Sequence, residues 1–199
     1  MIHLYKKGTS ENTLLLLHGT GGDENDLLEI GNLIDSEANI LSVRGNVVES
    51  GMNRYFKRLR PGVFDLDDLE KRTVELYEFI NEASKKYEFD RNKVIAVGYS
   101  NGANIAASML FSIENAIKGA ILLRSMVPRR DKELVNNRNS KVFIAAGTHD
   151  NICPPEESKE LASLLEASEA DVKLEWINGN HRLTYEEFLI IKDWYNNKF

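Results

Sequence analysis

The most informative stretch of this chain is Gly98-Tyr99-Ser100-Asn101-Gly102. It follows the apolar run Lys93-Val94-Ile95-Ala96-Val97 and precedes a helix-like segment that begins Ala103-Asn104-Ile105. In a G-x-S-x-G turn between a strand and a helix, the glycines let the backbone fold tightly and hold the serine hydroxyl clear of the sheet. The pattern is weak when it stands alone, but the strand and helix around it make Ser100 a candidate nucleophile.

Apolar runs and helical patterns alternate along the rest of the chain. Continuous apolar runs such as Leu14–Leu17 predict strands that are buried on both faces, as in parallel sheets. We expect strands at residues 14–17, 40–43, 94–97, 120–123, 142–146 and 172–177. We expect helices from an Asp23 cap to about Ile30 or Ile34, from an Asp65 cap to Tyr87, and over residues 103–112, 156–167 and 184–194. This order predicts an α/β fold with a mostly parallel, doubly wound sheet, helices on both faces and ligands at the carboxyl ends of the strands.

Size and charge narrow the possible classes of function. A chain of 199 residues, 42% of them hydrophobic, is expected to form a single domain, residues 1–199. The net charge of −6 offers no general electrostatic attraction for nucleic acid or an anionic membrane. The first residues lack a signal-peptide pattern and no apolar run could span a bilayer, so we expect a cytoplasmic protein. Cys153 is the only cysteine, which excludes an internal disulfide and a cysteine-rich metal site.

Residues 44–63 interrupt the alternation with three glycines and a proline. A segment of this kind is expected to face the substrate, and the alternative is a surface connection whose aromatic side chains fill the core. Two interpretations stay open for a set of apolar residues in this segment and further along the chain: they line an acyl pocket, or they belong to the hydrophobic core. These residues are Met52, Tyr55, Phe56, Met126, Val127 and Ile152.

Three reactive side chains follow three different predicted strands. Ser100 follows residues 94–97, Asp150 follows residues 142–146 and His181 follows residues 172–177. Because parallel strands end at one rim of a sheet, we expect the three side chains to meet there. Their order along the chain, Ser then Asp then His, is that of α/β hydrolases and differs from that of other serine-hydrolase folds.

This trio predicts acyl transfer through a covalent intermediate. His181 would take the proton of Ser100 as the hydroxyl attacks an acyl carbonyl, while Asp150 orients the imidazole. The backbone N–H groups of Asn101 and Thr20 are expected to bind the oxyanion, the latter from a glycine-rich turn. A simple tight turn is the alternative for those glycines. The mechanism calls for no cofactor and no metal.

Other histidines and acids compete for these roles. His149 adjoins the predicted acid and would point away from it, and His18 fits a structural role in the oxyanion turn. Asp131 and Glu175 are alternative acids, but neither combines a position after a strand with a Gly-Thr-His-Asp context. An ordinary loop histidine remains the alternative interpretation of His181.

These motifs resemble the bacterial phospholipase/carboxylesterase family of the α/β hydrolases, especially small carboxylesterases related to acyl-protein thioesterases. The segments that carry the resemblance are Leu14–Gly22, Asn53–Phe56, Gly98–Asn104, Met126–Pro128, Gly147–Asp150 and His181–Thr184. The resemblance implies the α/β-hydrolase fold in a minimal form without a lid domain, and frequently a homodimer. This sequence departs from the family at Asn180, where a glycine commonly precedes the histidine, and at Asn151-Ile152-Cys153-Pro154 after the acid.

We therefore expect a serine carboxylesterase that hydrolyses small carboxylic esters through an acyl-enzyme intermediate. Acyl thioesterase or lysophospholipase activity is the alternative within catalysis. A non-catalytic ligand-binding protein with a hydrolase fold is the alternative of another class, which displacement of His181 by Asn180 would favour. The expected partner is a small-molecule ester, with no nucleic acid and no membrane. Whether the chain also forms a homodimer is left open.

Overall fold

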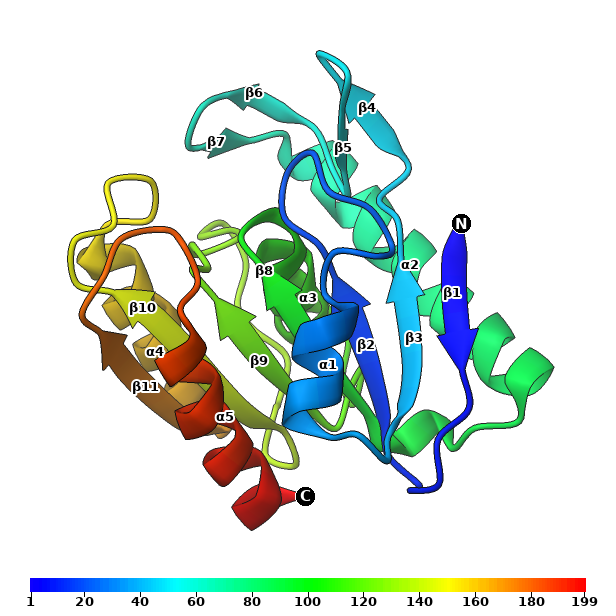
Figure 1. Cartoon of the computed structure of the whole chain (residues 1–199). Helices are drawn as coiled ribbons and strands as arrows, with labels where there is room; N and C mark the ends of the chain where they lie inside the picture. Colours follow the sequence, from blue (N-terminus) through cyan, green and yellow to red (C-terminus); the bar gives the residue numbers. More distant parts are fainter.

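A seven-stranded sheet forms the centre of the computed structural model, which describes residues 1–199 (Figure 1). In spatial order its strands are β1 (His3–Lys6), β3 (Asn39–Val43), β2 (Thr13–Leu17), β8 (Val94–Tyr99), β9 (Gly119–Leu123), β10 (Lys141–Gly147) and β11 (Asp171–Ile177). All neighbouring strands are parallel except β1, which is antiparallel to β3 at one edge. The predicted mostly parallel sheet is confirmed, and β1 is an addition that the sequence analysis did not contain.

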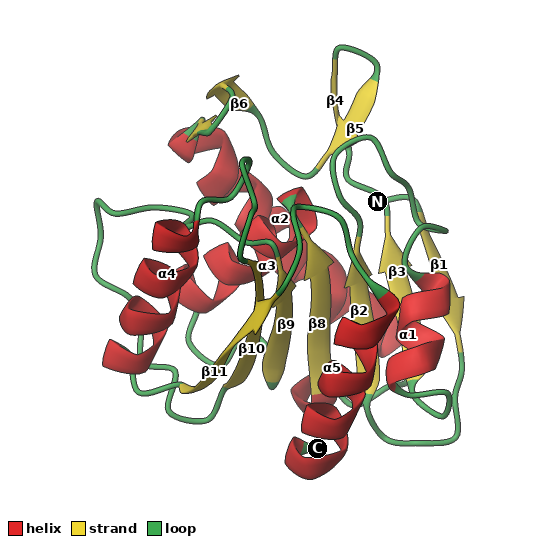
Figure 2. Cartoon of the chain, turned by 60° about the vertical axis from the view of Figure 1, so that its left-hand side comes forward, coloured by secondary structure: helices red, strands yellow, loops and turns green.

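Helices cover both faces of this sheet, as predicted (Figure 2). On one face lie α1 (Leu28–Ile34) and α5 (Tyr185–Lys198), which contact each other. On the other face lie α2 (Leu66–Tyr87), α3 (Asn101–Ser112) and α4 (Pro155–Ala167), and a short 3₁₀ turn, η1 (Arg91–Lys93), leads into β8. No helix in the structure combines the length and the apolar character that crossing a membrane requires.

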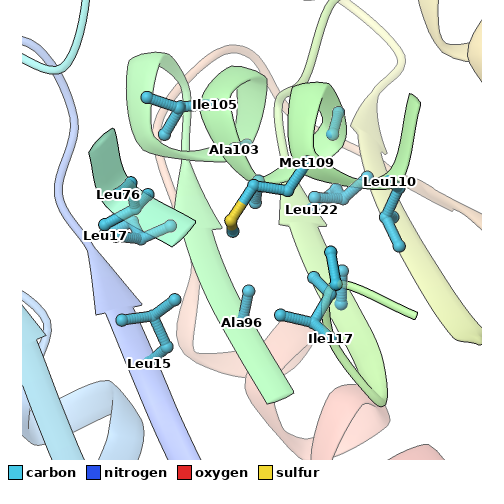
Figure 3. Packing of buried hydrophobic residues seen from close by; sticks show 14 of the residues in the cluster. Leu15, Leu17, Leu76, Ala96, Ala103, Ile105, Met109, Leu110, Ile117 and Leu122 are labelled. Atoms are coloured by element: carbon cyan, nitrogen blue, oxygen red, sulfur yellow. The ribbon is translucent and has the colours of Figure 1, made fainter. Parts of the chain in front are cut away.

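The strand residues divide between two cores because successive side chains point to opposite faces of the sheet. Leu15, Leu17 and Ala96 face the α2–α3 side, where they meet Leu76 and Met109 (Figure 3). The intervening strand residues pack under α1 and α5. With both faces covered, every residue of β2 is buried, which explains the unbroken apolar run in the sequence. Burial of each such leucine contributes about 1.5–3 kcal/mol to folding.

The two predicted helix caps have different outcomes. Asp65 caps α2 as predicted, because its Oδ1 accepts the N–H of Asp68 at 3.1 Å. The prediction that Asp23 caps α1 is wrong, since that helix begins only at Leu28. Asp23 Oδ1 instead accepts the N–H of Asn25 at 2.8 Å. This local turn competes with helix formation and satisfies the backbone that a helix would have used.

Two small hairpins, absent from the sequence analysis, occupy the irregular segment after β3. They pair β4 (Val47–Glu49) with β5 (Met52–Arg54) and β6 (Arg58–Arg60) with β7 (Val63–Phe64). Both hairpins stand beyond the carboxyl ends of the parallel strands, at the top of the view in Figure 1. Their tips contain Gly51 and Gly62, whose φ angles of +77° and +74° favour glycine. The hairpins therefore border the rim where the reactive residues were expected.

Candidate active site

Ser100 lies at the junction of β8 and α3. Its backbone has φ 50° and ψ −110°, a conformation that non-glycine residues rarely adopt. Its N–H donates to the Leu123 carbonyl of the neighbouring strand at 2.8 Å, and its own carbonyl accepts the N–H of Asn104 at 2.9 Å. Hydrogen bonds on both sides of the residue thus hold the strained turn in place.

The glycines on either side of Ser100 are needed for space. Neither has a positive φ, so backbone conformation does not require glycine there. A Cβ on Gly98 would lie 2.6 Å from the backbone nitrogen of Ala103. A Cβ on Gly102 would collide with the carbonyl oxygen of Leu17. Small residues at these positions let the start of α3 lie directly against β8 and β2.

His181 connects Ser100 to Asp150. Its Nε2 lies 3.0 Å from Ser100 Oγ, and its Nδ1 lies 2.7 Å from Asp150 Oδ2. An ionised carboxylate only accepts hydrogen bonds, so Nδ1 carries the proton and Nε2 presents its lone pair to the hydroxyl. The loops after β8, β10 and β11 thus bring together the three side chains that the sequence singled out.

Asp150 is buried and held by its own loop. Its side chain has no exposed surface. Oδ1 accepts the N–H of Ile152 at 2.8 Å and the N–H of Cys153 at 2.9 Å. These two bonds satisfy one carboxylate oxygen and direct the other, Oδ2, to His181. The segment that departs from the family pattern therefore supplies both backbone donors.

Asn180 does not displace the neighbouring histidine. Its Oδ1 accepts the N–H of Arg182 at 2.9 Å, which forms a turn across His181, and its φ is not positive. The hydroxyl of Tyr99 donates to the His181 carbonyl at 3.1 Å, with the two rings 5.5 Å apart. The His181 side chain keeps 17% of its surface exposed, so a ligand can reach the imidazole.

The turn that contains Thr20 packs against Tyr99 and Gly102, on either side of Ser100. A Cβ on Gly19 would lie 2.7 Å from the ring of Tyr99, and a Cβ on Gly102 would lie 2.6 Å from the His18 carbonyl oxygen. The Thr20 N–H has no acceptor within the chain. Asn101 occupies the first position of α3, where a helix offers no acceptor for the N–H. Both predicted oxyanion donors are thus free to bind a ligand.

Residues of β5 hold this turn in place by hydrogen bonds. Gly21 N–H donates to the Asn53 carbonyl at 2.9 Å, and Asn53 Nδ2 donates to the Gly22 carbonyl at 2.8 Å. Arg54 Nη1 donates to Thr20 Oγ1 at 2.9 Å. The sequence analysis missed this supporting role. The polar pair Asn-Arg directly before two aromatic residues was the signal available for it.

His18 and Tyr55 support the same turn from inside the protein. The Tyr55 hydroxyl accepts the His18 N–H at 3.1 Å and donates to the Val43 carbonyl. His18 Nδ1 donates to the Gly19 carbonyl at 2.6 Å, and Nε2 accepts the Gly45 N–H at 3.0 Å. Burial lowers the pKa of His18, which favours the neutral ring. Its one ring lone pair already accepts the Gly45 N–H, so the ring has none left to act as a base. His18 is structural, as the sequence analysis favoured.

The competing histidine and acids lie elsewhere. The exposed His149 ring contacts the Thr148 hydroxyl at 2.9 Å. Asp131 pairs with Arg129 at 2.8 Å, which holds the pKa of the carboxyl down at about 2. Glu175 pairs with a lysine two residues earlier at 3.2 Å. None of these groups contacts Ser100.

A cavity of ≈ 400 Å³ opens between the β6–β7 hairpin and the loop after β9. Its apolar lining residues are Val63, Phe64, Leu66, Met126 and Val127. Tyr55 and Phe56 take the alternative role, because both are fully buried in the core. Ile152 is largely exposed. Of the apolar residues singled out in the sequence, only Met126 and Val127 therefore line this cavity.

Comparisons with known proteins agree with this architecture. The sequence model of the phospholipase/carboxylesterase family matches residues 4–198. A Bacillus subtilis (strain 168) protein named "Putative hydrolase MhqD" is 54% identical over 195 residues, or 98% of both chains. The crystal structure of a Bacillus cereus carboxylesterase matches with a TM-score of 0.97 and 55% identity, covering 99% of this chain and 94% of that one. YahD, solved with malic acid, has a TM-score of 0.93 and 33% identity, with 100% and 99% covered. This chain belongs to the phospholipase/carboxylesterase family of the α/β hydrolases.

Proposed function

We propose that this protein is a serine carboxylesterase that hydrolyses small carboxylic esters through an acyl-enzyme intermediate. The observation that carries the proposal is the unbroken chain of contacts from Ser100 Oγ through His181 to the buried Asp150, with distances of 3.0 and 2.7 Å. Membership of a family of phospholipases and carboxylesterases supports an ester as the substrate. A non-catalytic binding protein would be favoured by displacement of His181 from Ser100, but the two side chains are in contact.

In the first half-reaction, Ser100 Oγ attacks the ester carbonyl carbon while His181 Nε2 takes the hydroxyl proton. The carbonyl π electrons move to oxygen, and a tetrahedral intermediate forms. When it collapses, the bond to the alcohol oxygen breaks and His181 returns the proton to that oxygen. Asp150 stabilises the imidazolium that exists between the two proton transfers. The products are a free alcohol and an acyl ester of Ser100.

In the second half-reaction, a water molecule takes the place of the alcohol. His181 removes one of its protons as the oxygen attacks the acyl carbon, and the same proton then goes to Ser100 Oγ as the acyl–oxygen bond breaks. The carboxylic acid leaves and the resting hydroxyl is restored. Every proton in the cycle moves through a single nitrogen, Nε2, which the contact between Nδ1 and Asp150 keeps unprotonated at rest.

The backbone N–H groups of Thr20 and Asn101 are proposed to bind the oxygen of the tetrahedral intermediate. Their freedom from other acceptors supports this role, and so does the rigid scaffold of hydrogen bonds behind the Thr20 turn. Donors fixed in advance stabilise the developing charge without reorganising, and loss of one typically lowers kcat by about 10²–10³-fold.

The test is hydrolysis of p-nitrophenyl acetate and butyrate together with labelling by a fluorophosphonate. We expect the native protein to be active and labelled once per chain, and Ser100→Ala to lose both properties. Ser112→Ala, which changes an exposed serine at the end of the same helix, is the matched control and should behave as wild type. Labelling of Ser100→Ala at another residue would reject the nucleophile assignment.

A second panel separates the remaining alternatives within catalysis. Esters, thioesters and lysophospholipids of matched acyl length should be compared by kcat/KM. A preference of more than about tenfold for a thioester or a lysophospholipid would replace the carboxylesterase assignment with that activity. The single domain, a homodimeric assembly, a cytoplasmic location and the lack of nucleic-acid binding stay predictions from the sequence.

A further inference from the structure

Arg124 is a fully buried cation at the end of β9, close to the loop that carries His181. Only 1% of its surface is exposed. Its φ of 57° lies in the left-handed region, which is costly for a residue with a side chain. The signal in the sequence is a charged residue directly after the buried strand Gly119–Leu123, which the sequence analysis did not use. A strained, buried charge persists only where its surroundings hold it firmly.

Every N–H of the Arg124 guanidinium has an acceptor. Nε donates to the Asn180 carbonyl at 2.9 Å, and Nη2 donates to the Arg182 carbonyl at 3.0 Å. Nη1 donates to the Ala145 carbonyl at 3.2 Å. The remaining donors bind both carboxylate oxygens of Glu187, at 2.8 and 3.2 Å. The planar guanidinium thus fixes the spacing of all these acceptors.

Two of the acceptors are the carbonyls on either side of His181. The carbonyl of His181 itself accepts the Tyr99 hydroxyl, so three consecutive carbonyls of this loop are held from the sheet side. Tyr99 immediately precedes Ser100. The adjacent ends of β8 and β9 therefore position both the Ser100 hydroxyl and the backbone that carries the His181 imidazole.

Glu187 supplies the counter-charge and extends the connection to α5. Its side chain is fully buried, and it also accepts the N–H of Thr184 in a capping box at the start of that helix. The ion pair joins β9, the His181 loop and α5 into one rigid unit. A buried ion pair is a poor source of stability, since apolar residues of similar volume often replace it without loss. Stability is therefore a weak reason for its presence here.

We propose that Arg124, through its pair with Glu187, is a positioning residue that holds the His181 loop where Nε2 reaches the Ser100 hydroxyl. The inference rests on the proposed serine esterase activity. Arg124 does not touch the reacting atoms; it acts through the two carbonyls that flank the histidine. A positional error of about 1 Å in a catalytic group lowers the rate about 100-fold.

The test is the double variant Arg124→Met, Glu187→Leu, which removes both charges and leaves no unpaired ion in the core. We expect kcat for p-nitrophenyl butyrate to fall about 10- to 100-fold, with KM changed less than about threefold. The low-field proton NMR signal of the His181–Asp150 hydrogen bond should broaden or disappear. The protein should stay folded at the assay temperature with Tm lowered by a few degrees, because Glu187→Leu also removes the capping-box contact with the Thr184 N–H. The control is Arg138→Met, Glu169→Leu, which removes an exposed ion pair between the loop after β9 and the turn after α4 and should change neither kcat nor the signal.

A double variant with kcat within twofold of wild type and an intact proton signal would overturn the proposal. If the double variant does not fold, Arg124→Lys keeps the charge opposite Glu187 but offers three donors on one atom in place of the fork. We expect the same loss of kcat, and wild-type kcat in Arg124→Lys would overturn the proposal. If wild type itself hydrolyses no ester, the proposed function fails, and the NMR signal alone still decides whether Arg124 positions His181.

Discussion

The backbone N–H of Cys153 donates to Asp150 Oδ1 at 2.9 Å, while the other carboxylate oxygen faces His181 at 2.7 Å. The N–H of Ile152 donates to the same Oδ1 at 2.8 Å. The carboxylate is therefore surrounded only by donors, and both of its oxygens are committed. An acid in this position cannot rotate or be replaced by a group that carries a donor of its own without breaking a buried hydrogen bond.

Asp150→Asn is expected to lower kcat on the order of 10⁴-fold while the fold is retained. With its oxygen toward the two backbone N–H groups, the new amide nitrogen faces His181 Nδ1 and donates to it. The imidazole proton then sits on Nε2, which can no longer accept the Ser100 proton. Steady-state kinetics on p-nitrophenyl butyrate measure the loss. Asp131→Asn is the control and should match wild type. Activity of the Asp150 variant within tenfold of wild type would contradict the orienting role.

Thr20→Val is expected to keep kcat within about tenfold of wild type, because the proposed oxyanion donor is the backbone N–H and not the hydroxyl. The hydroxyl is already engaged as an acceptor for Arg54 at 2.9 Å. Thr20→Ser keeps this contact and should be indistinguishable from wild type. A fall of about 10²–10³-fold in Thr20→Val, with Thr20→Ser unaffected, would contradict this prediction and show that the Thr20 hydroxyl is required, as an acceptor for Arg54 or as a donor to the substrate.

The free energy of unfolding is expected to fall as the pH drops below about 6.5. Burial lowers the pKa of His18 in the folded protein, whereas in the unfolded chain the ring titrates near its ordinary value. Below that value the unfolded chain binds a proton that the folded protein refuses, so the contribution is complete above the unfolded pKa and is lost on acidification. Urea unfolding between about pH 7 and pH 5 measures the slope, which should be smaller in His18→Asn. Equal slopes in the two proteins would rule out His18 as the source.

The thiol of Cys153 is expected to be unreactive in the native protein. It is buried, and its Sγ donates to the Ser125 carbonyl at 3.0 Å. Burial raises its pKa to about 12, so the nucleophilic thiolate is absent at neutral pH. Ellman's reagent should detect one thiol per chain after unfolding in guanidinium and none within minutes before it. Rapid reaction of the native protein would contradict this burial.

The central strands could be predicted because each is buried on both faces and is therefore an apolar run in the sequence. The edge strand His3–Lys6 alternates between half-buried and exposed residues over only four positions, which gives no such signal. The two hairpins between Val47 and Phe64 are shorter still, and their pairing depends on turns at glycines. The start of α1 was misplaced because Asp23 closes a local turn with Asn25 that resembles a helix cap.

The order of residues along this chain was enough to indicate Ser100, Asp150 and His181, since each follows a strand whose apolar pattern is local. Covalent neighbours and periodicity carry that information. The clamp of Arg124 and Glu187 on the His181 loop was decided only when the chain folded, because its partners lie 63 residues apart in sequence. The same is true of the support that Asn53 and Arg54 give to the Thr20 turn. Such contacts depend on which side chains the packed sheet and helices bring within 3 Å, and no local pattern encodes that distance.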